Sequence, residues 1–469
     1  MPNRPQFDCA AAFDEVFSAD ALVAIFQKKF SNSAAKGVDR RNGFQFSANA
    51  ADELAVAARK CSEGTFRFSP FRENLKHRGR LRAPRLISIP TIRDRVILHQ
   101  LKDLLGTAFP ECVPRNVAST LVRKIATDLR ACDPETTYVG GCDIRDFYDN
   151  IKWRRLLSAV GQRLTDKRAL DLVARSLQTP TVPDSARRNE YKAWRKQRGV
   201  PQGLAVSNVL ASIFMATLDT GMRALPGNYL RYVDDVLVYG TEQEVRHASA
   251  AFIARCRARG LPVHGPGSGK THLGSVRTRF GYLGYLFRWP EITVREATVE
   301  RLLQSIAAKF SNHKHNRDKF LRGHKHLNVA RYDEIFLAEL NERITGAISE
   351  GRRYGWIAYF SEISDLTLLH KLDNVVRRMF KRLPDFEGKP PAGLRSFARA
   401  YFEIKFNPKG GYVRDFDKIV SPVEMLRFLN DRGRIEPTDA LTDDAIEGRY
   451  FRYRHAILGA MQADEGMIY

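Results

Sequence analysis

One stretch limits what this chain can fold into more than any other. In Tyr229–Gly240, the adjacent Asp234 and Asp235 interrupt an otherwise apolar and aromatic run. The β-branched and bulky residues on both sides favour two short strands whose tight connection carries the acidic pair. Two such carboxylates repel each other unless a cation lies between them or one takes up a proton, and their oxygens suit Mg²⁺ or Mn²⁺. An aspartate-rich β-turn without a cation explains the same string, so the rest of the chain has to decide.

The charge of the whole chain favours a polyanionic partner. Its 469 residues include 76 Lys and Arg against 53 Asp and Glu, a formal net charge of +23, and nucleic acid is the simplest partner for such an excess. No apolar run reaches the roughly eighteen residues of a membrane span, and the N-terminus lacks a signal-peptide pattern. The six cysteines show no Cys-x-x-Cys spacing, which argues against a zinc or disulfide framework. We therefore expect a cytoplasmic protein of several compact units, without membrane association.

Hydrophobic periodicity predicts the elements around the acidic stretch. Helical spacing indicates helices at 19–30, 48–61, 94–105, 205–218 and 242–259, and one longer helical segment at 151–177. A buried strand at 137–142 delivers Asp143 at its end, and 280–287 is typical of an aromatic hairpin. The polar stretch 180–197 is expected to be a surface insertion, and helical patterns dominate beyond Arg295.

Residues 67–95 carry almost only positive charge, interleaved with Phe66, Phe68 and Phe71. Alternating basic and aromatic residues can follow a phosphate backbone and stack on bases, although a solvated basic hairpin has the same composition. The basic residues of this segment are Arg67, Arg72, Lys76, Arg78, Arg80, Arg82, Arg85, Arg93 and Arg95.

Asp143, Asp234 and Asp235 together are the residue types that two-metal nucleotidyl transfer requires, because carboxylates can hold two divalent ions beside a reacting phosphate. Three segments in this order resemble the central motifs of reverse transcriptases: Cys142–Ile151 (CDIRDFYDNI), Gly199–Asn208 (GVPQGLAVSN) and Tyr232–Asp235 (YVDD). Within that family the chain is most similar to bacterial enzymes of the group-II-intron-like lineage, and among these to antiphage-defence and abortive-infection reverse transcriptases.

The resemblance implies an α+β fold, that of a right-hand polymerase with fingers, palm, α-helical thumb and a small C-terminal extension. It divides the chain into an N-terminal helical extension of the fingers (1–65), fingers and palm (66–295), thumb (296–385) and C-terminal extension (386–469). It also implies RNA-directed DNA synthesis with dNTPs and Mg²⁺ (or Mn²⁺), a DNA product, an RNA template that is a dedicated non-coding RNA, and a role in antiviral defence. Partner proteins and a homo-oligomer stay open.

The resemblance further assigns roles in catalysis and metal binding. Asp143, Asp234 and the backbone of Ile144 would hold the metal ions, and Asp235 would complete the acidic cluster. Lys270 would act as a general acid near the leaving pyrophosphate. The string Gly267–Thr271 also suggests a P-loop, but that motif requires glycine where this chain has His264.

Contacts to the nucleotide and the primer follow from the same resemblance. Tyr148 would exclude a 2′-hydroxyl, although a plain core tyrosine is the alternative, and Arg85, Gln202 and Gly203 would bind the incoming nucleotide. The primer grip would comprise Phe280, Tyr282, Leu283 and Gly284.

Two other functions stay open at this stage. The same palm site could carry out untemplated or protein-primed DNA synthesis, because the C-terminal region offers several tyrosine hydroxyls. A catalytically inactive, nucleic-acid-binding scaffold would retain the basic surface but show no metal-dependent incorporation. We find neither a cysteine-paired endonuclease module nor an acidic RNase H cluster in the sequence.

Overall fold

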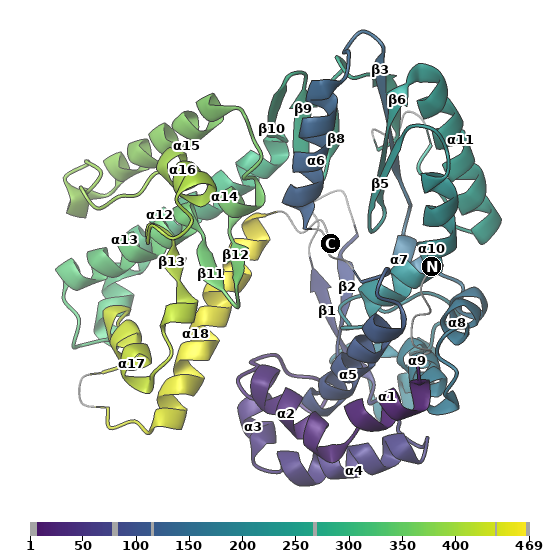
Figure 1. The fold of residues 1–469 in the computed structure, drawn as a ribbon. Helices are drawn as coiled ribbons and strands as arrows, with labels where there is room; N and C mark the ends of the chain where they lie inside the picture. Colours follow the sequence, from purple (N-terminus) through teal and green to yellow (C-terminus); the bar gives the residue numbers. More distant parts are fainter. Residues whose placement is uncertain (1–6, 77–82, 114–116, 266–269, 437–438, 466–469) are drawn as a thin grey trace. The chain divides into compact units, whose positions relative to one another are not determined.

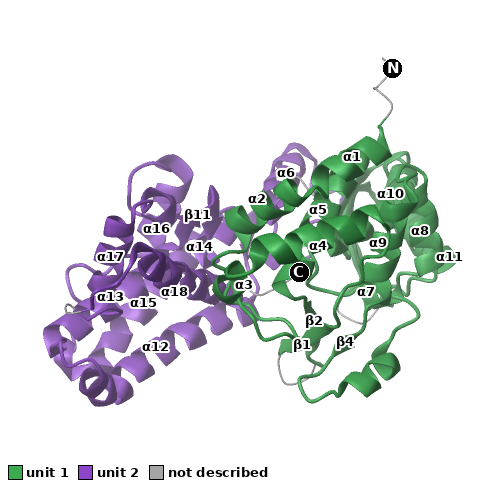
Figure 2. Cartoon of the chain, turned by 90° about the horizontal axis from the view of Figure 1, so that it is seen from below, with its two compact units in different colours: residues 1–116, 138–274 green, residues 117–137, 275–469 purple. Residues whose placement is uncertain are grey.

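A computed structural model describes residues 7–76, 83–113, 117–265, 270–436 and 439–465. The chain forms two compact units, one of residues 1–116 and 138–274 and the other of residues 117–137 and 275–469 (Figure 2). Both units are discontinuous, so α6 (Ala118–Ala131) belongs to the second unit although its neighbours in the sequence belong to the first. The four-part division by role that the sequence suggests stays a prediction.

Five helices form one end of the first unit. Side-chain caps begin several of them: Asp8 accepts hydrogen bonds at the start of α1, Ser18 at α2 and Thr91 at α5, which satisfies backbone N–H groups that a helix leaves unpaired. The apolar faces pack around α5, which is buried over most of its length. The helices are α1 (Cys9–Val16), α2 (Ala19–Lys29), α3 (Gly43–Ser47), α4 (Ala50–Ser62) and α5 (Ile92–Ala108).

A three-stranded sheet of order β2-β1-β4 carries the basic segment. Strand β1 (Phe71–Lys76) pairs antiparallel with β2 (Arg85–Ile89) and parallel with β4 (Thr181–Val182). Residues 180–197 are mostly exposed, as expected for a surface insertion, but their first residues form β4 and extend this sheet before η1 (Arg188–Trp194). Arg78, Arg80 and Arg82 lie outside the described residues.

A four-stranded sheet of order β5-β6-β3-β7 holds the acidic stretch (Figure 1). Its strands are β5 (Asn228–Tyr232), β6 (Asp235–Thr241), β3 (Thr137–Asp143) and β7 (His272–Ser275). Helix α11 (Glu242–Arg259) follows β6 directly through a capping box of Thr241 and Glu244, and α10 (Ser207–Arg223) precedes β5. The expected hairpin, the strand before Asp143 and both helices are confirmed.

The segment 151–177 is two helices rather than the single one that its periodicity predicts. After α7 (Phe147–Asn150), α8 (Trp153–Gly161) ends in a turn where Leu164 is fully buried, and α9 (Lys167–Gln178) begins anew. Asp166 causes the restart because its carboxylate accepts a hydrogen bond from the Arg168 N–H at 2.7 Å and caps α9.

The second unit is mainly helical and has two small sheets, of order β10-β9-β8 and β12-β11-β13. The first sheet confirms the aromatic hairpin at 280–287, and the long helices confirm the helical pattern beyond Arg295. Its strands are β8 (Phe280–Tyr282), β9 (Tyr285–Arg288), β10 (Glu291–Val294), β11 (Ala347–Ser349), β12 (Arg352–Tyr354) and β13 (Arg414–Asp415). Besides α6, its helices are α12 (Glu296–Gly323), α13 (Val329–Thr345), α14 (Trp356–Tyr359), α15 (Leu366–Met379), η2 (Phe380–Arg382), η3 (Pro384–Phe386), α16 (Phe397–Phe406), η4 (Phe416–Lys418), α17 (Pro422–Asp431) and α18 (Asp443–Asp464). Among the described residues, no helix has both the length and the apolar character needed to cross a bilayer.

Candidate active site

The end of β3 and the turn of the β5–β6 hairpin lie side by side. The Ile144 N–H donates a hydrogen bond to the Asp234 carbonyl at 3.1 Å, so the residue after Asp143 is bonded directly to the hairpin turn. Val233 and Asp234 form that turn, with Tyr232 paired to Asp235. Val233 has a φ of +57°, a conformation that is unfavourable for a β-branched residue and is found where the surrounding structure enforces it.

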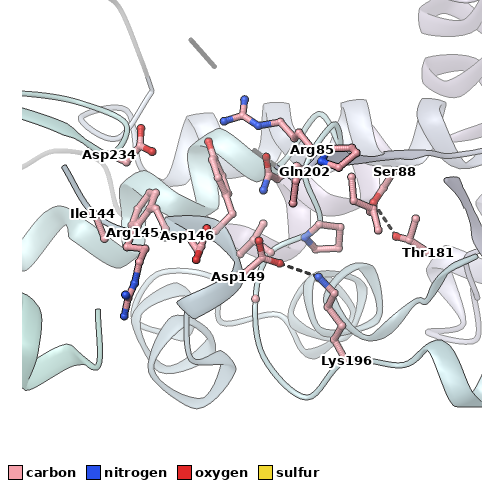
Figure 3. A pocket seen from close by; sticks show the side chains of 18 of the residues that line it. Arg85, Ser88, Ile144, Arg145, Asp146, Asp149, Thr181, Lys196, Gln202 and Asp234 are labelled. Atoms are coloured by element: carbon pink, nitrogen blue, oxygen red, sulfur yellow. Dashed lines mark hydrogen bonds and ion pairs between the residues drawn. The ribbon is translucent and has the colours of Figure 1, made fainter. Parts of the chain in front are cut away.

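A cavity of about 700 Å³ in the first unit opens at this junction. In the view of Figure 3, Asp234 and Arg85 lie along one side of it and the pair of Asp149 and Lys196 along another. The cavity brings together seven of the residues that the sequence assigns to the site: Arg85, Asp143, Ile144, Tyr148, Gln202, Asp234 and Lys270. Asp235 and Gly203 are not among the described residues that line it.

The electrostatics around Asp234 suit a cation. Burial, followed by the negative charge of Asp143, raises the pKa of Asp234 from 3.8 to about 6, and the positive charges of Arg85 and Lys270 partly oppose that rise. A divalent cation would stabilise the ionised form of Asp234, which burial and the neighbouring carboxylate disfavour. Asp143 and Asp234 therefore fit the expected Mg²⁺ or Mn²⁺.

Asp143 has two basic neighbours in this structure. Lys270 donates a hydrogen bond from Nζ to Asp143 Oδ2 at 3.0 Å, and His264 Nε2 lies 3.5 Å from Oδ1. Lys270 Nζ and His264 Nε2 are themselves 3.1 Å apart. Burial and the Lys270 charge both lower the pKa of His264, so this imidazole is neutral at physiological pH. Three residues of the rejected P-loop string, 267–269, lie outside the described part of the chain.

Asp235 occupies a different place from Asp234. The sequence puts both in the hairpin connection, but Asp235 is the first residue of β6, and side chains alternate along a strand. Its charge adds to burial in raising the pKa of the Cys142 thiol to about 11. Of the described residues, Asp143, Asp234 and Asp235 do not form a group with three ligand atoms within 4.8 Å of one another.

The glycine-bounded loop 199–203 closes another side of the cavity. The Ser88 N–H of β2 donates to the Gln202 carbonyl at 2.7 Å, which fixes the loop to the strand that carries Arg85. Gly203 has a φ of +99°, and a Cβ there would lie 2.6 Å from Ile87 Cγ2. Only glycine therefore fits at this position without strain.

Tyr148 lies in α7, which follows β3, and its side chain is partly buried. Its hydroxyl donates a hydrogen bond to Asn208 Oδ1 at 2.6 Å. Burial and the charge of Asp234 raise the pKa of Tyr148, so the phenol stays protonated. The side chain thus lines the cavity close to Asp234, as a gate would, while Asn208 at the start of α10 holds its orientation.

Several cavity residues were not identified from the sequence. Lys196 Nζ pairs with Asp149 Oδ1 at 2.7 Å, and Trp194 also lines the cavity. Both belong to the stretch that we took for an insertion, although its aromatic and basic content was a signal for nucleic-acid contact. His264 was noted only as the residue that breaks the P-loop spacing.

The predicted primer-grip residues lie in the second unit. Phe280 and Tyr282 are in β8, and Leu283 and Gly284 form the turn to β9. The Phe280 ring stacks on Phe287 with centroids 4.6 Å apart, and the side chains of Phe280, Tyr282 and Leu283 are buried. Their role at a primer end stays a prediction.

The sequence model of the reverse transcriptase (RNA-dependent DNA polymerase) family matches residues 75–287. An uncharacterised 91 kDa protein in the cob intron of Schizosaccharomyces pombe is 26% identical over 136 residues, which are 29% of this chain and 16% of that protein. The chain thus spans about a sixth of the length of that relative.

Two solved telomerase structures also resemble the chain. That of Candida tropicalis, truncated from its C-terminal domain, has a TM-score of 0.40 and 13% identity over 49% of this chain and 55% of its own. That of Candida albicans, in complex with a TWJ fragment of telomeric RNA, has a TM-score of 0.41 and 11% identity over 74% and 68%. The family match together with the mixed helices and sheets confirms the expected α+β polymerase fold class.

Proposed function

Because residues 75–287 form a reverse transcriptase domain, we propose that the chain is an RNA-directed DNA polymerase that transfers dNMP from a dNTP to a 3′-hydroxyl. The observation that carries the proposal is the junction of Asp143 and Asp234 in a cavity that also holds Arg85, Tyr148 and Gln202. Acidic, basic and ring side chains converge there, as a nucleoside triphosphate with its metal ions requires.

Asp143, Asp234 and the backbone of Ile144 would hold two divalent ions, with Asp235 adding negative charge from β6. Such ions, when bound, supply activation of the 3′-hydroxyl and stabilisation of charge on the reacting phosphate. Asp143 must exchange its hydrogen bond with Lys270 for this role. Lys270 then becomes available to donate a proton toward the leaving pyrophosphate.

The remaining cavity residues would position the nucleotide. The positive charge of Arg85 acts to lower the pKa of both Tyr148 and Asp234. Arg85 would bind the triphosphate, because guanidinium geometry matches phosphate oxygens. Tyr148 would lie under the sugar and exclude a 2′-hydroxyl by steric contact. Gln202 would contact the nucleotide from the loop 199–203. This loop can approach β2 closely because residue 203 is glycine.

Incorporation of labelled dTTP on a poly(rA)·oligo(dT) substrate with Mg²⁺ tests this function. Asp143→Asn and Asp234→Asn should each abolish incorporation, whereas Asp171→Asn, which changes an exposed carboxylate of α9 that does not line the cavity, should leave it intact. Wild-type rates in either active-site variant would refute the site. Incorporation that continues without the RNA strand would indicate untemplated synthesis. DNA that stays attached to the protein after nuclease digestion would indicate protein priming.

We also propose a bacterial group-II-intron-like origin, a dedicated non-coding RNA template and a role in antiviral defence. Support comes from the three sequence motifs and from the match to part of an intron-encoded protein, together with the charge of +23. Sequencing the RNA that co-purifies with the wild-type chain should return one dominant species. Phage plating on cells expressing wild type or Asp234→Asn tests defence, and equal plaque numbers would contradict it.

A further inference from the structure

Three side chains from separate segments of the second unit converge, and none of them lines the cavity of the first unit. His313 belongs to α12, Asp333 to α13 and Asp385 to η3, and one ligand atom of each lies within 4.8 Å of the others. We propose that this trio is a structural binding site for a divalent transition-metal ion, with Zn²⁺ the best-suited cation.

The buried histidine provides the first argument. His313 is only 3% exposed, and its ring is stacked between Tyr332 and Phe336 at centroid distances of 4.6 and 4.2 Å. Its Nε2 lies 3.0 Å from Asp333 Oδ1, yet neither ring nitrogen has a hydrogen-bond partner. A buried polar atom without a partner is destabilising because it has lost its hydrogen bonds to water, and a metal bond to Nε2 would remove that penalty.

Charge provides the second argument. Asp333 and Asp385 bring two carboxylates to the site, and of these two Arg317 pairs with Asp385, at 2.6 Å, besides its pair with Asp318 at 3.2 Å. A divalent cation would balance the negative charge of Asp333, the carboxylate that Arg317 does not pair with. Neutral imidazole is the form of histidine that binds metal.

The donor set identifies the class of metal. One imidazole nitrogen and two carboxylate oxygens suit Zn²⁺ with a water completing four-coordination, whereas Mg²⁺ prefers oxygen donors only. Asp385 is an exposed residue, so an ion can enter from solvent. Binding would tie the consecutive helices α12 and α13 to the segment after η2, about 40 residues further along the chain.

Metal content and affinity of the full chain test the proposal. Asp143→Asn with Asp234→Asn serves as the background, so that ions bound in the polymerase cavity do not contribute. After treatment with EDTA, titration with Zn²⁺ alone should show one bound ion per chain, and Co²⁺ should give the visible absorption of a four-coordinate site.

In this background, Asp333→Asn and Asp385→Asn should each raise the Kd for Zn²⁺ at least about 100-fold, because each removes a direct ligand. Asp318→Asn, on the exposed side of α12, is the matched control and should not change the Kd. Arg317→Gln removes the ion pair but no ligand, so it should leave the Kd unchanged or lower it.

Zn²⁺ should also raise the unfolding temperature of the background protein but not that of the Asp333→Asn variant, which reports binding without any enzymatic readout. Two results would overturn the proposal. One is a background protein that binds no Zn²⁺ at micromolar concentration. The other is an Asp333→Asn variant that is folded, by circular dichroism, and binds Zn²⁺ as tightly as its parent.

Discussion

Replacing Asp234 by asparagine should abolish catalysis and stabilise the metal-free protein. The folded structure raises the pKa of this carboxyl from 3.8 to about 6, so folding disfavours its charged form. At about 1.4 kcal/mol per pH unit, this corresponds to about 3 kcal/mol lost from the free energy of unfolding at pH 8. Asparagine removes the charge without changing the shape, so up to that amount should be regained.

The direction of the pH dependence follows from the sign of the pKa change. Below pH 3.8 the carboxyl is protonated in both folded and unfolded chains, and it contributes no penalty. The penalty grows as the pH rises through about 6 and is complete above it. The stability gain of Asp234→Asn should therefore be largest at pH 7–8 and small near pH 4.

Thermal unfolding in EDTA at several pH values measures this gain. Since 1 kcal/mol corresponds to about 2–4 °C in a domain of this size, the increase in Tm should be up to about 10 °C. Mn²⁺ or Mg²⁺ should reduce the difference, because only the wild-type protein binds the ions through this carboxylate. Asp149→Asn, which loses an exposed ion pair with Lys196, should not raise Tm. An Asp234→Asn protein with an unchanged or lower Tm at pH 8 would refute the reasoning.

Three further substitutions test other parts of the first unit. Tyr148→Ala should increase relative use of rNTP over dNTP by about 10-fold or more in kcat/KM, with unaltered discrimination as the contrary result. Arg85→Ala should raise the KM for dNTP more than the Kd for RNA, and loss of RNA binding alone would show that Arg85 has another ligand. Arg231 is only 10% exposed and pairs with Asp219 at 2.5 Å. Asp219→Asn removes that carboxylate and should reduce the free energy of unfolding, measured in urea, by about 3–5 kcal/mol. Adding Arg231→Met should recover part of the loss.

The residues that carry local patterns could be predicted from the sequence. Alternation around Asp234 and the strand before Asp143 depend on neighbours a few positions away, and the structure contains those elements. The error at 151–177 shows the limit of periodicity, because the apolar spacing continues through the turn where Asp166 begins a new helix. Asp235 was misplaced for a related reason, since a one-residue difference decides whether a side chain belongs to the turn or to β6.

The sequence by itself determined which chemistry the chain carries: the acidic hairpin, the glycine-bounded loop and the basic charge are readable because short-range spacing encodes them. Only the tertiary structure decided which further residues join a site. His264 beside Asp143, Lys196 in the cavity wall, and the convergence of His313 with Asp333 and Asp385 all depend on how elements pack. Packing of this kind depends on the burial of whole surfaces, which no local pattern of residues encodes.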